Sequence, residues 1–230
     1  MDSRPIYTCY RADSPIIVDG RLDEPCWRAA EPISLVRTDT GEPPRFPTTV
    51  KLLWDDRFLY AGFHCIDPDI WGTITERDGP MYEEEVVEVF IDANRDGISY
   101  VELEVNPLNV ALDLYMLNRQ GRRWGLFDWD STDWQHAVTV DGYLNQRDRG
   151  DRSWTVEMAI PLADLATAPH IPPLNGDVWR VNLYRIDRGT YGDEYSAWSP
   201  TWEINYHISS RFGEVVFCDQ PVSGRDWQVF

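Results

Sequence analysis

The chain contains 230 residues, enough to bury a large core and to form one domain over residues 1–230. Its formal net charge of −18 argues against nucleic acid and anionic membranes as partners, because a phosphate surface attracts Lys and Arg. The charge is compatible with a neutral ligand such as a sugar, with cations such as calcium, or with solubility alone. The 11 Trp, 11 Tyr and 8 Phe can supply rings to both a core and a binding surface.

No apolar run approaches the roughly 20 residues that a membrane-spanning helix needs. Residues 1–16 lack a basic segment followed by an apolar one, so no signal peptide is visible and a cytoplasmic location is expected unless a leader has been removed. The cysteines Cys9, Cys26, Cys65 and Cys218 show no metal-binding spacing. Cys65 belongs to an apolar strand and is expected to be a buried free thiol.

The first predicted elements lie between Pro15 and Trp27, where a short strand and an Asp-Gly turn precede a short helix. Asp23 as the N-cap and Pro25 in the first turn suit the start of a helix. Further strands are expected at residues 48–54, 58–66, 86–92, 99–106, 110–116, 137–140, 154–160, 179–187 and 211–218, with one helical turn at 161–165. This pattern predicts an all-β fold, a single β-sandwich of jelly-roll or immunoglobulin-like type with one or two short helical turns.

The most informative stretch, residues 81–107, contains two strands that alternate between apolar and polar residues. Alternation at period two predicts one buried face and one polar face. The apolar positions are Val87, Val89, Ile91, Val101, Leu103 and Val105, and the polar face carries Glu88, Phe90, Asp92, Tyr100, Glu102, Glu104 and Asn106. Carboxylates and amides bind hydroxyl groups, and flat rings stack on the apolar faces of sugars. The polar face is therefore interpreted as a carbohydrate-binding wall, although any solvated sheet face has a similar composition.

In the third strand of this meander, the residues expected to face the core are Val110, Leu112, Leu114 and Met116, with Ala111, Asp113 and Tyr115 facing out. Residues 118–134 are expected to form a long loop that buries its own aromatic rings.

The segment from Asp92 to Gly97 reproduces the first half of a calcium-binding loop. Asp92, Asn94 and Asp96 would supply oxygen ligands to calcium. The twelfth position of such a loop is Leu103, however, so the usual bidentate Glu is missing. A plain hairpin turn is the alternative, since Asp-Gly is common in such turns.

Taken in chain order, these segments resemble a family 9 carbohydrate-binding module, a type found beside xylanases and as stand-alone bacterial proteins. The matching positions are residues 17–20, 22–25, Trp27, residues 50–54 and 58–60, Asp67, Pro68, Glu85, Val87, Glu88, Phe90, Asp92, Tyr100, Glu102, Glu104, Asn106, Pro107, Trp154, Val156, Glu157, Ile160, Pro161, Trp179, Val181, Asn182, Arg185, Trp198, Phe212 and Gly213. The resemblance covers nearly the whole chain and implies a jelly-roll-like sandwich, no catalysis, structural calcium and a role in polysaccharide catabolism.

The resemblance also implies a site in which two tryptophan rings clamp a terminal sugar. The corresponding positions here are Tyr82 and Tyr206. Polar contacts would come from Glu88 and from a basic residue on the next strand, which here is the acid Glu104. The candidate carbohydrate-binding residues are Tyr82, Glu88, Glu104, Arg180, Asn182, Trp202 and Tyr206, and the expected partner is an oligo- or polysaccharide.

Three other functions remain open. The sandwich could have lost sugar binding and serve as an interaction module. Glu88, Glu102 and Glu104 could act in glycoside hydrolysis, although acids this close together offer no evident acid and base pair. A haem-binding sandwich of the DOMON type would need axial ligands such as Met81 and His207, which nothing in the sequence fixes as a pair.

Overall fold

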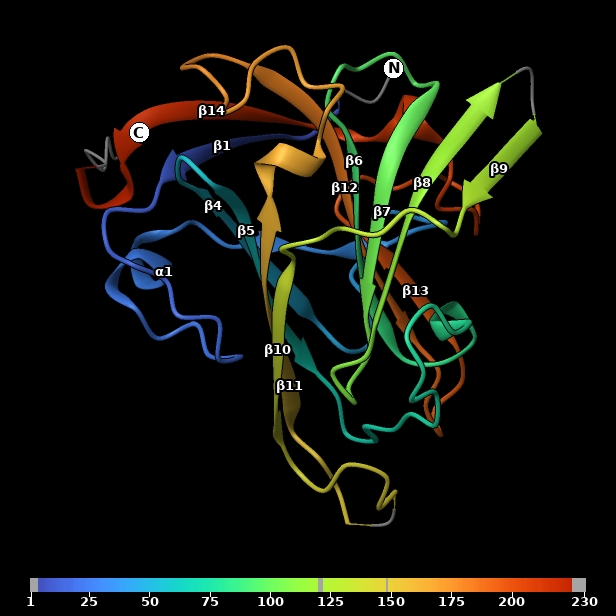
Figure 1. Ribbon diagram of the computed structural model, residues 1–230. Coiled ribbons are helices and arrows are strands. Elements are labelled where there is room, and N and C mark those ends of the chain that lie inside the picture. Colours follow the sequence, from blue (N-terminus) through green and yellow to red (C-terminus); the bar gives the residue numbers. More distant parts are fainter. Residues whose placement is uncertain (1–3, 120–121, 148, 225–230) are drawn as a thin grey trace.

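The computed structural model describes residues 4–119, 122–147 and 149–224 (Figure 1). The strands are β1 (Ile6–Arg11), β2 (Ile33–Ser34), β3 (Val36–Arg37), β4 (Thr48–Trp54), β5 (Phe58–Ile66), β6 (Val86–Asp92), β7 (Ser99–Val105), β8 (Ala111–Arg119), β9 (Arg122–Leu126), β10 (Gln135–Asp141), β11 (Ser153–Pro161), β12 (Val178–Asp187), β13 (Glu194–Ala197) and β14 (Gly213–Pro221). One α-helix, α1 (Pro25–Ala29), and four short 3-10 turns, Met81–Glu83, Leu162–Asp164, Ser209–Arg211 and Val222–Gly224, complete the described elements.

These strands form a sandwich whose two layers are joined by hydrogen bonds across one end. The strand order is β10-β11-β5-β4-β1-β14-β12-β6-β7-β8-β9, and β13 pairs with β12. Figure 1 shows β4, β5, β10 and β11 in one layer and β6, β7, β8 and β12 in the other, with β1 and β14 crossing between them. The expected single all-β sandwich with short helical turns is therefore confirmed.

The main core fills the space between the two layers because alternate residues of each strand point inward. Val89 and Leu103, directly opposite each other on β6 and β7, meet Phe63 of β5 and Trp154 of β11 in this core. Cys65 is also part of it and is a buried free thiol, as expected. The expected apolar positions of β6 and β7 all belong to this core.

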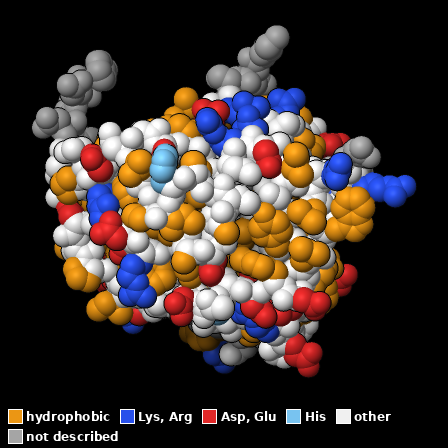
Figure 2. Space-filling model, turned by 45° about the horizontal axis from the view of Figure 1, so that its top comes forward, with side chains coloured by type: hydrophobic (Ala, Val, Ile, Leu, Met, Phe, Trp, Pro, Cys, Tyr) orange, Lys and Arg blue, Asp and Glu red, His pale blue; other side chains and the backbone are white. Residues whose placement is uncertain are grey.

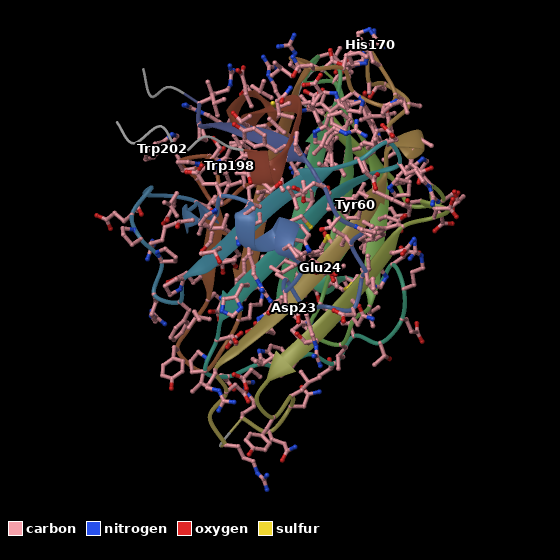
Figure 3. The ribbon with its side chains drawn as sticks, turned by 90° about the vertical axis from the view of Figure 1, so that its left-hand side faces the viewer. Asp23, Glu24, Tyr60, His170, Trp198 and Trp202 are labelled. Atoms are coloured by element: carbon pink, nitrogen blue, oxygen red, sulfur yellow. The ribbon has the colours of Figure 1, made fainter. Side chains whose placement is uncertain are left out.

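A smaller apolar cluster covers the outer face of the β4-β5-β11 layer. Helix α1 lies over this face, and its residues Cys26 and Trp27 pack against the strands around Tyr60 (Figure 3). The indole Nε1 of Trp27 donates a hydrogen bond of 2.9 Å to Glu157 of β11. The helix is thereby fixed on the side of the molecule remote from β7 and β8.

A buried guanidinium group closes one end of the main core. Arg185 of β12 is 1 % exposed and donates hydrogen bonds to Asp67 at 2.8 Å and to Asp187 at 3.3 Å. It also donates to the carbonyl oxygen of Ile66 at 2.8 Å. The same group lies 3.8 Å from Glu85. One buried cation thus compensates three acids that would otherwise be costly to bury.

Several expectations for individual elements were wrong. On β8, Leu112 and Leu114 face away from the main core, whereas Asp113 is buried and Tyr115 packs against the core. The alternation was assigned to the wrong faces because a second apolar cluster makes both faces of this strand nonpolar. The loop expected at 118–134 contains β9, which extends the sheet beside β8.

The N-terminal elements also differ from expectation. Residues 15–18 form no strand, and Glu24 rather than Asp23 is the N-cap of α1, while Pro25 does lie in the first turn. The carboxylate of Glu24 instead accepts a hydrogen bond of 3.0 Å from the backbone N–H of Ile17.

In the described residues no helix is long and apolar enough to cross a membrane.

Loss of the buried cation should destabilise the sandwich strongly. Replacing Arg185 with Met leaves Asp67, Glu85 and Asp187 without their shared partner, and we expect a loss of about 3–5 kcal/mol in the free energy of unfolding. Urea denaturation measures this value. The control is Arg180→Met on the same strand, since Arg180 is only partly buried and its hydrogen bond goes to the carbonyl oxygen of Arg95. Equal losses in both variants would contradict the special role of Arg185.

Candidate carbohydrate-binding site

The outer face of the β12-β6-β7-β8 layer contains a pocket of about 610 Å³. We call it the sheet pocket. Its lining residues are Tyr82, Glu88, Glu102, Glu104, Leu114, Met116, Arg123, Gly125, Phe127, Ile186, Tyr195, Ile204, Asn205, Tyr206 and His207. Side chains cover this sheet face at one end and leave it open at the other, and the open end is the sheet pocket.

The filled end is packed with aromatic rings. Phe90 stacks on Tyr100 with ring centroids 5.6 Å apart, and Phe212 meets both rings edge-on. The segment from Trp198 to Phe212 is held over this end by Asn182, whose Nδ2 donates to the carbonyl oxygen of Ser199 at 2.9 Å. These contacts form a rigid floor beside the pocket.

Three glutamates at the centre of the sheet pocket form what we call the acid cluster, namely Glu88, Glu102 and Glu104. Glu88 of β6 lies directly opposite Glu104 of β7, and Glu102 lies two residues along the same strand. All three side chains point to the same face because residues two apart on a strand share a face. Their carboxylate oxygens come within 4.8 Å of one another.

The acid cluster is buried and has few partners. Glu88, Glu102 and Glu104 are 2 %, 5 % and 1 % exposed. One oxygen of each carboxyl group accepts no hydrogen bond from a residue outside the cluster. Within the cluster, Glu102 and Glu104 can share a hydrogen bond. Buried polar atoms are normally satisfied, so three adjacent exceptions make the acid cluster the candidate place for a ligand.

Burial raises the pKa of every member of the acid cluster. Desolvation is the main cause, and the pKa of Glu102 rises to about 7. The pKa values of Glu88 and Glu104 lie well above the usual range for Glu, because burial is reinforced by repulsion between the neighbouring carboxylates. The neighbour His207 does not offset this charge, since burial and Arg123 lower its pKa to about 4 and keep it neutral at pH 7.

The two tyrosines expected to form a clamp both line the sheet pocket, but in different ways. Tyr82 lies on the turn Met81–Glu83 and is 46 % exposed. Tyr206 is 8 % exposed; its ring stacks on Tyr184 with centroids 3.9 Å apart, and its hydroxyl donates to the carbonyl oxygen of Arg185 at 2.9 Å. Tyr82 is therefore available to a ligand, whereas Tyr206 is also a structural part of the wall.

Arg180 and Asn182 share the outer face with the acid cluster but do not line the pocket. The amide of Asn182 is fully buried and bonds Tyr184, Leu183 and Ser199. The guanidinium of Arg180 donates to the carbonyl oxygen of Arg95 beyond the filled end. Both residues support the layer at a distance from the acids.

Trp202 lies at a separate hollow that it lines together with Arg4, Pro200 and Arg211. Figure 3 shows Trp202 beside Trp198 at the edge of the molecule. The ring of Trp202 rests close to Gly41, where an added Cβ would approach it to 3.0 Å. The structure does not bring this ring to the acid cluster.

Asp92, Asn94 and Asp96 form a hairpin turn between β6 and β7. Asp92 accepts a hydrogen bond from the N–H of Gly97 at 2.9 Å, and Asp96 accepts from Ile98 and Ser99. The amide oxygen of Asn94 accepts from the N–H of Asp96, and its Nδ2 donates to the second oxygen of Asp96. The oxygens that calcium would need are thus mostly engaged in the turn, and these residues fit a turn better than a calcium site.

Two groups of acids in the described ranges could hold a cation. One is the acid cluster. The other, Asp78, Asp113 and Asp130, surrounds the guanidinium group of Arg77, which forms an ion pair with each of them. Arg77 already supplies the positive charge in the second group, so only the acid cluster lacks a cation.

Some pocket residues were not among the candidates from the sequence. Glu102 could have been found, because it occupies the same face of β7 as Glu104. Arg123 and Phe127 come from β9 and the turn after it, and Tyr195 comes from β13; neither strand was predicted. The residues near these strands carry no alternating pattern long enough to reveal them.

The fold and the sequence were compared with known proteins. A structure described as a candidate carbohydrate-binding protein from Bacteroides uniformis matches with a TM-score of 0.75 and 17 % identity, covering 94 % of this chain and all of that one. A family 9 carbohydrate-binding module from Caldicellulosiruptor kristjanssonii in complex with cellotriose matches with a TM-score of 0.62 and 17 % identity, covering 97 % of each chain. At such identities the likeness shows the fold.

Sequence relatives point the same way. An extracellular protein of Arthroderma benhamiae is 26 % identical over 203 residues, which is 83 % of this chain and 86 % of that protein. Endo-1,4-beta-xylanase A of Thermoanaerobacterium saccharolyticum is 25 % identical over 207 residues, 89 % of this chain but only 16 % of the enzyme. A model of the family described as "Carbohydrate family 9 binding domain-like" matches residues 18–220. The chain therefore belongs to the carbohydrate family 9 binding domain-like family, as the sequence resemblance implied.

Proposed function

We propose that this protein binds an oligo- or polysaccharide non-covalently in the sheet pocket. The observation that carries the proposal is the pocket itself, in which unsatisfied carboxyl oxygens lie beside exposed and half-buried aromatic rings. Carboxyl groups bind hydroxyls and rings stack on sugar faces, so the two kinds of group suit one ligand. Family membership and the fold shared with a module that holds cellotriose support this function.

Each candidate residue has a proposed role. Tyr82 would stack on the sugar, with Tyr206 as the opposite wall, and Glu88 and Glu104 would bind hydroxyl groups. Asn182 and Arg180 would act indirectly by supporting the sheet, and Trp202 would be an additional contact only for a ligand that extends to its separate hollow. Because the related xylanases are enzymes of which this chain matches a small part, we propose a role in polysaccharide breakdown alongside a catalytic partner.

Binding without catalysis is the function that the site chemistry favours. A glycosidase places its two carboxyl groups on either side of the bond to be cleaved. The three acids here extend from one face of two neighbouring strands and form a single wall. Met81 is buried outside the pocket lining, and His207 bonds Tyr100, so neither supports a haem function.

Ligand binding and the two tyrosines can be tested together by calorimetry with xylo-, cello- and manno-oligosaccharides. We expect at least one dissociation constant in the micromolar to millimolar range, or roughly −8 to −4 kcal/mol. Tyr82→Ala should weaken binding by about 1–3 kcal/mol with little change in melting temperature, because the ring is half exposed. Tyr206→Ala should instead lower the melting temperature, since it removes a buried ring and a hydrogen bond.

The control for the second variant is Tyr206→Phe, which keeps the ring and removes only the hydroxyl. Unchanged affinity in Tyr82→Ala would refute stacking at that position. Silence of the folded protein across a broad glycan panel would favour an interaction module instead. Turnover of any of these glycans that Glu88→Gln abolishes would establish a hydrolase.

The acid cluster also predicts how stability depends on pH. The folded-state pKa values of Glu88, Glu102 and Glu104 lie above those of the unfolded chain, so the folded protein retains protons that the unfolded chain releases. The free energy of unfolding should therefore fall as pH rises from 6.5 to 8.5, by up to about 1.4 kcal/mol per pH unit for each retained proton. Below about pH 6.5 the partly buried histidines His64, His136 and His207 oppose this trend, because their lowered pKa values act in the other direction.

Urea denaturation at several pH values measures the slope. Glu104→Gln should flatten it and raise stability at pH 8, because the amide neither titrates nor repels Glu88. Glu42→Gln is the matched control, since it removes an exposed carboxylate outside the pocket lining and should leave the slope unchanged. A slope that is the same in all three proteins would show that the cluster does not titrate in this range.

Calcium at Asp92, Asn94 and Asp96 stays a prediction that the turn geometry disfavours. We expect excess calcium to raise the melting temperature through this turn slightly or not at all, because a ligand stabilises only in proportion to its binding of the folded state. Differential scanning fluorimetry with calcium and with a chelator provides the measurement. A large rise that disappears in Asp96→Ala would reveal a functional calcium site in the turn.

A further inference from the structure

The centre of the sheet pocket holds three carboxyl groups that, in the free protein, keep protons rather than pair with a cation. Within residues 4–119, 122–147 and 149–224, the ion pairs connect the acid cluster to no Lys or Arg. The one imidazole nearby, His207, lies 3.6 Å from Glu102 and is neutral at pH 7. Arg123 lines the pocket from β9, but its guanidinium bonds the amide oxygen of Asn205 at 3.2 Å.

The contrast with the opposite face of β12 is informative, because Arg185 on that face is adjacent in sequence to Tyr184, which lies opposite Glu88. There, Arg185 compensates Asp67, Glu85 and Asp187 from within the protein. Three acids are buried at each place, but only one group has a fixed cation. The free energy cost of burying unpaired carboxylates in the sheet pocket would be removed by a ligand that brings the positive charge with it.

The geometry of the cluster suits a primary ammonium group. Such a group has three N–H donors and no acceptor, and the cluster offers three oxygens that lack an external donor. Charge-assisted N–H···O bonds of about 2.8 Å in tetrahedral directions place their acceptors roughly 4.6 Å apart. The carboxylate oxygens of the cluster lie within 4.8 Å of one another, so they are close enough for one ammonium group to reach all three.

The rest of the pocket suits the ring of a sugar better than a metal ion. Tyr82, Tyr195 and Tyr206 present aromatic rings, and Leu114 and Met116 add apolar surface. Calcium requires six to eight oxygen ligands, and the pocket supplies few oxygens beyond the cluster. Arg123 would also repel a dication twice as strongly as an ammonium group. Aromatic faces, by contrast, attract an organic cation.

We propose that the sheet pocket is selective for an amino sugar, with the acid cluster binding its ammonium group and Tyr82 stacking on its ring. The chemical class is a hexosamine with a free amino group, such as glucosamine within a β-1,4-linked oligosaccharide. An N-acetylated sugar is disfavoured, because its amide is neutral and has a single N–H donor. This inference rests on the proposed function of carbohydrate binding and adds the identity of the group that the acids recognise.

Calorimetry on the whole chain at physiological ionic strength tests the inference with three ligands of equal size. These are the β-1,4-linked dimers of glucosamine, N-acetylglucosamine and glucose. We expect the glucosamine dimer to bind at least tenfold more tightly than the other two. Glu104→Gln should reduce its affinity by about tenfold and reduce the affinity for the glucose dimer much less, because the amide of Gln still bonds hydroxyl groups but cannot pair with an ammonium charge.

Two further variants make the result specific. Glu42→Gln removes the same charge from an exposed position outside the pocket lining, and it should leave the preference intact. Glu88→Gln repeats the test from the neighbouring strand, should Glu104→Gln fail to fold. An equal loss of affinity in Glu42→Gln would overturn the inference, since it would show general attraction to an acidic protein.

The remaining outcomes separate this inference from the proposed function. Equal affinities for the three dimers, or a preference that survives both Gln variants, would overturn amino-sugar selectivity and leave carbohydrate binding standing. Binding of all three dimers that a chelator abolishes would overturn it in favour of a metal ion at the acid cluster. Absence of binding to all three dimers, and to the wider glycan panel, would overturn both proposals.

Discussion

The burial of three carboxyl groups on one sheet face is the constraint on which the arrangement of this molecule depends. Glu88, Glu102 and Glu104 cannot retract into solvent, because their strands are paired on both sides and their backbone positions are fixed by register. Desolvation opposes their ionised forms, so the site is held at a cost in stability. A fold tolerates such a cost only if the remaining surfaces are well packed, and here both faces of the layer are filled around the pocket.

The wall of the pocket and the interior of the sandwich are connected through β12. Tyr184 and Ile186 face outward, whereas Arg185, between them, faces the buried acids at the end of the core. Tyr206 stacks on Tyr184 and bonds the backbone of Arg185, so the wall is attached to the strand that also carries the compensating cation. On the face drawn in Figure 2, charged side chains of both signs are interspersed, and hydrophobic side chains gather near the middle.

Sequence periodicity was sufficient to predict a strand and its buried face where one face of the strand is apolar and the other is not. It located β4, β5 and β6 within their observed limits and placed the acids of β7 on the correct face. It failed for β8, because apolar residues lie on both faces of that strand. It also missed β1, β9 and β13, whose short or irregular patterns acquire meaning only through pairing with distant strands. Local pattern cannot encode such pairing.

In the candidate site too, some residues could be placed from the sequence and others could not. Tyr82, Glu88, Glu104 and Tyr206 were placed on one pocket, since the order of segments along the chain fixes their strands and turns. The positions of Asn182 and Trp202 depend on the path of the segment from Trp198 to Phe212, which folds back over the sheet. Such a path is set by tertiary contacts, including the rings of Phe90 and Phe212, rather than by residues near in sequence.

Membership of a family with a shared sandwich does not fix what the pocket recognises. The resemblance implies a basic residue where Glu104 lies, and a base opposite Glu88 would form an ion pair within the protein. An acid at that position removes the internal partner and leaves both carboxyl groups to be satisfied by each other, by protons or by a ligand. The acid at position 104 thus changes the charge that the proposed ligand would bring. In a desolvated pocket, an unpaired carboxylate costs more free energy than a single hydrogen bond contributes. In the proposed amino-sugar selectivity, the positive charge that the protein does not supply matters as much as the aromatic rings that it does supply.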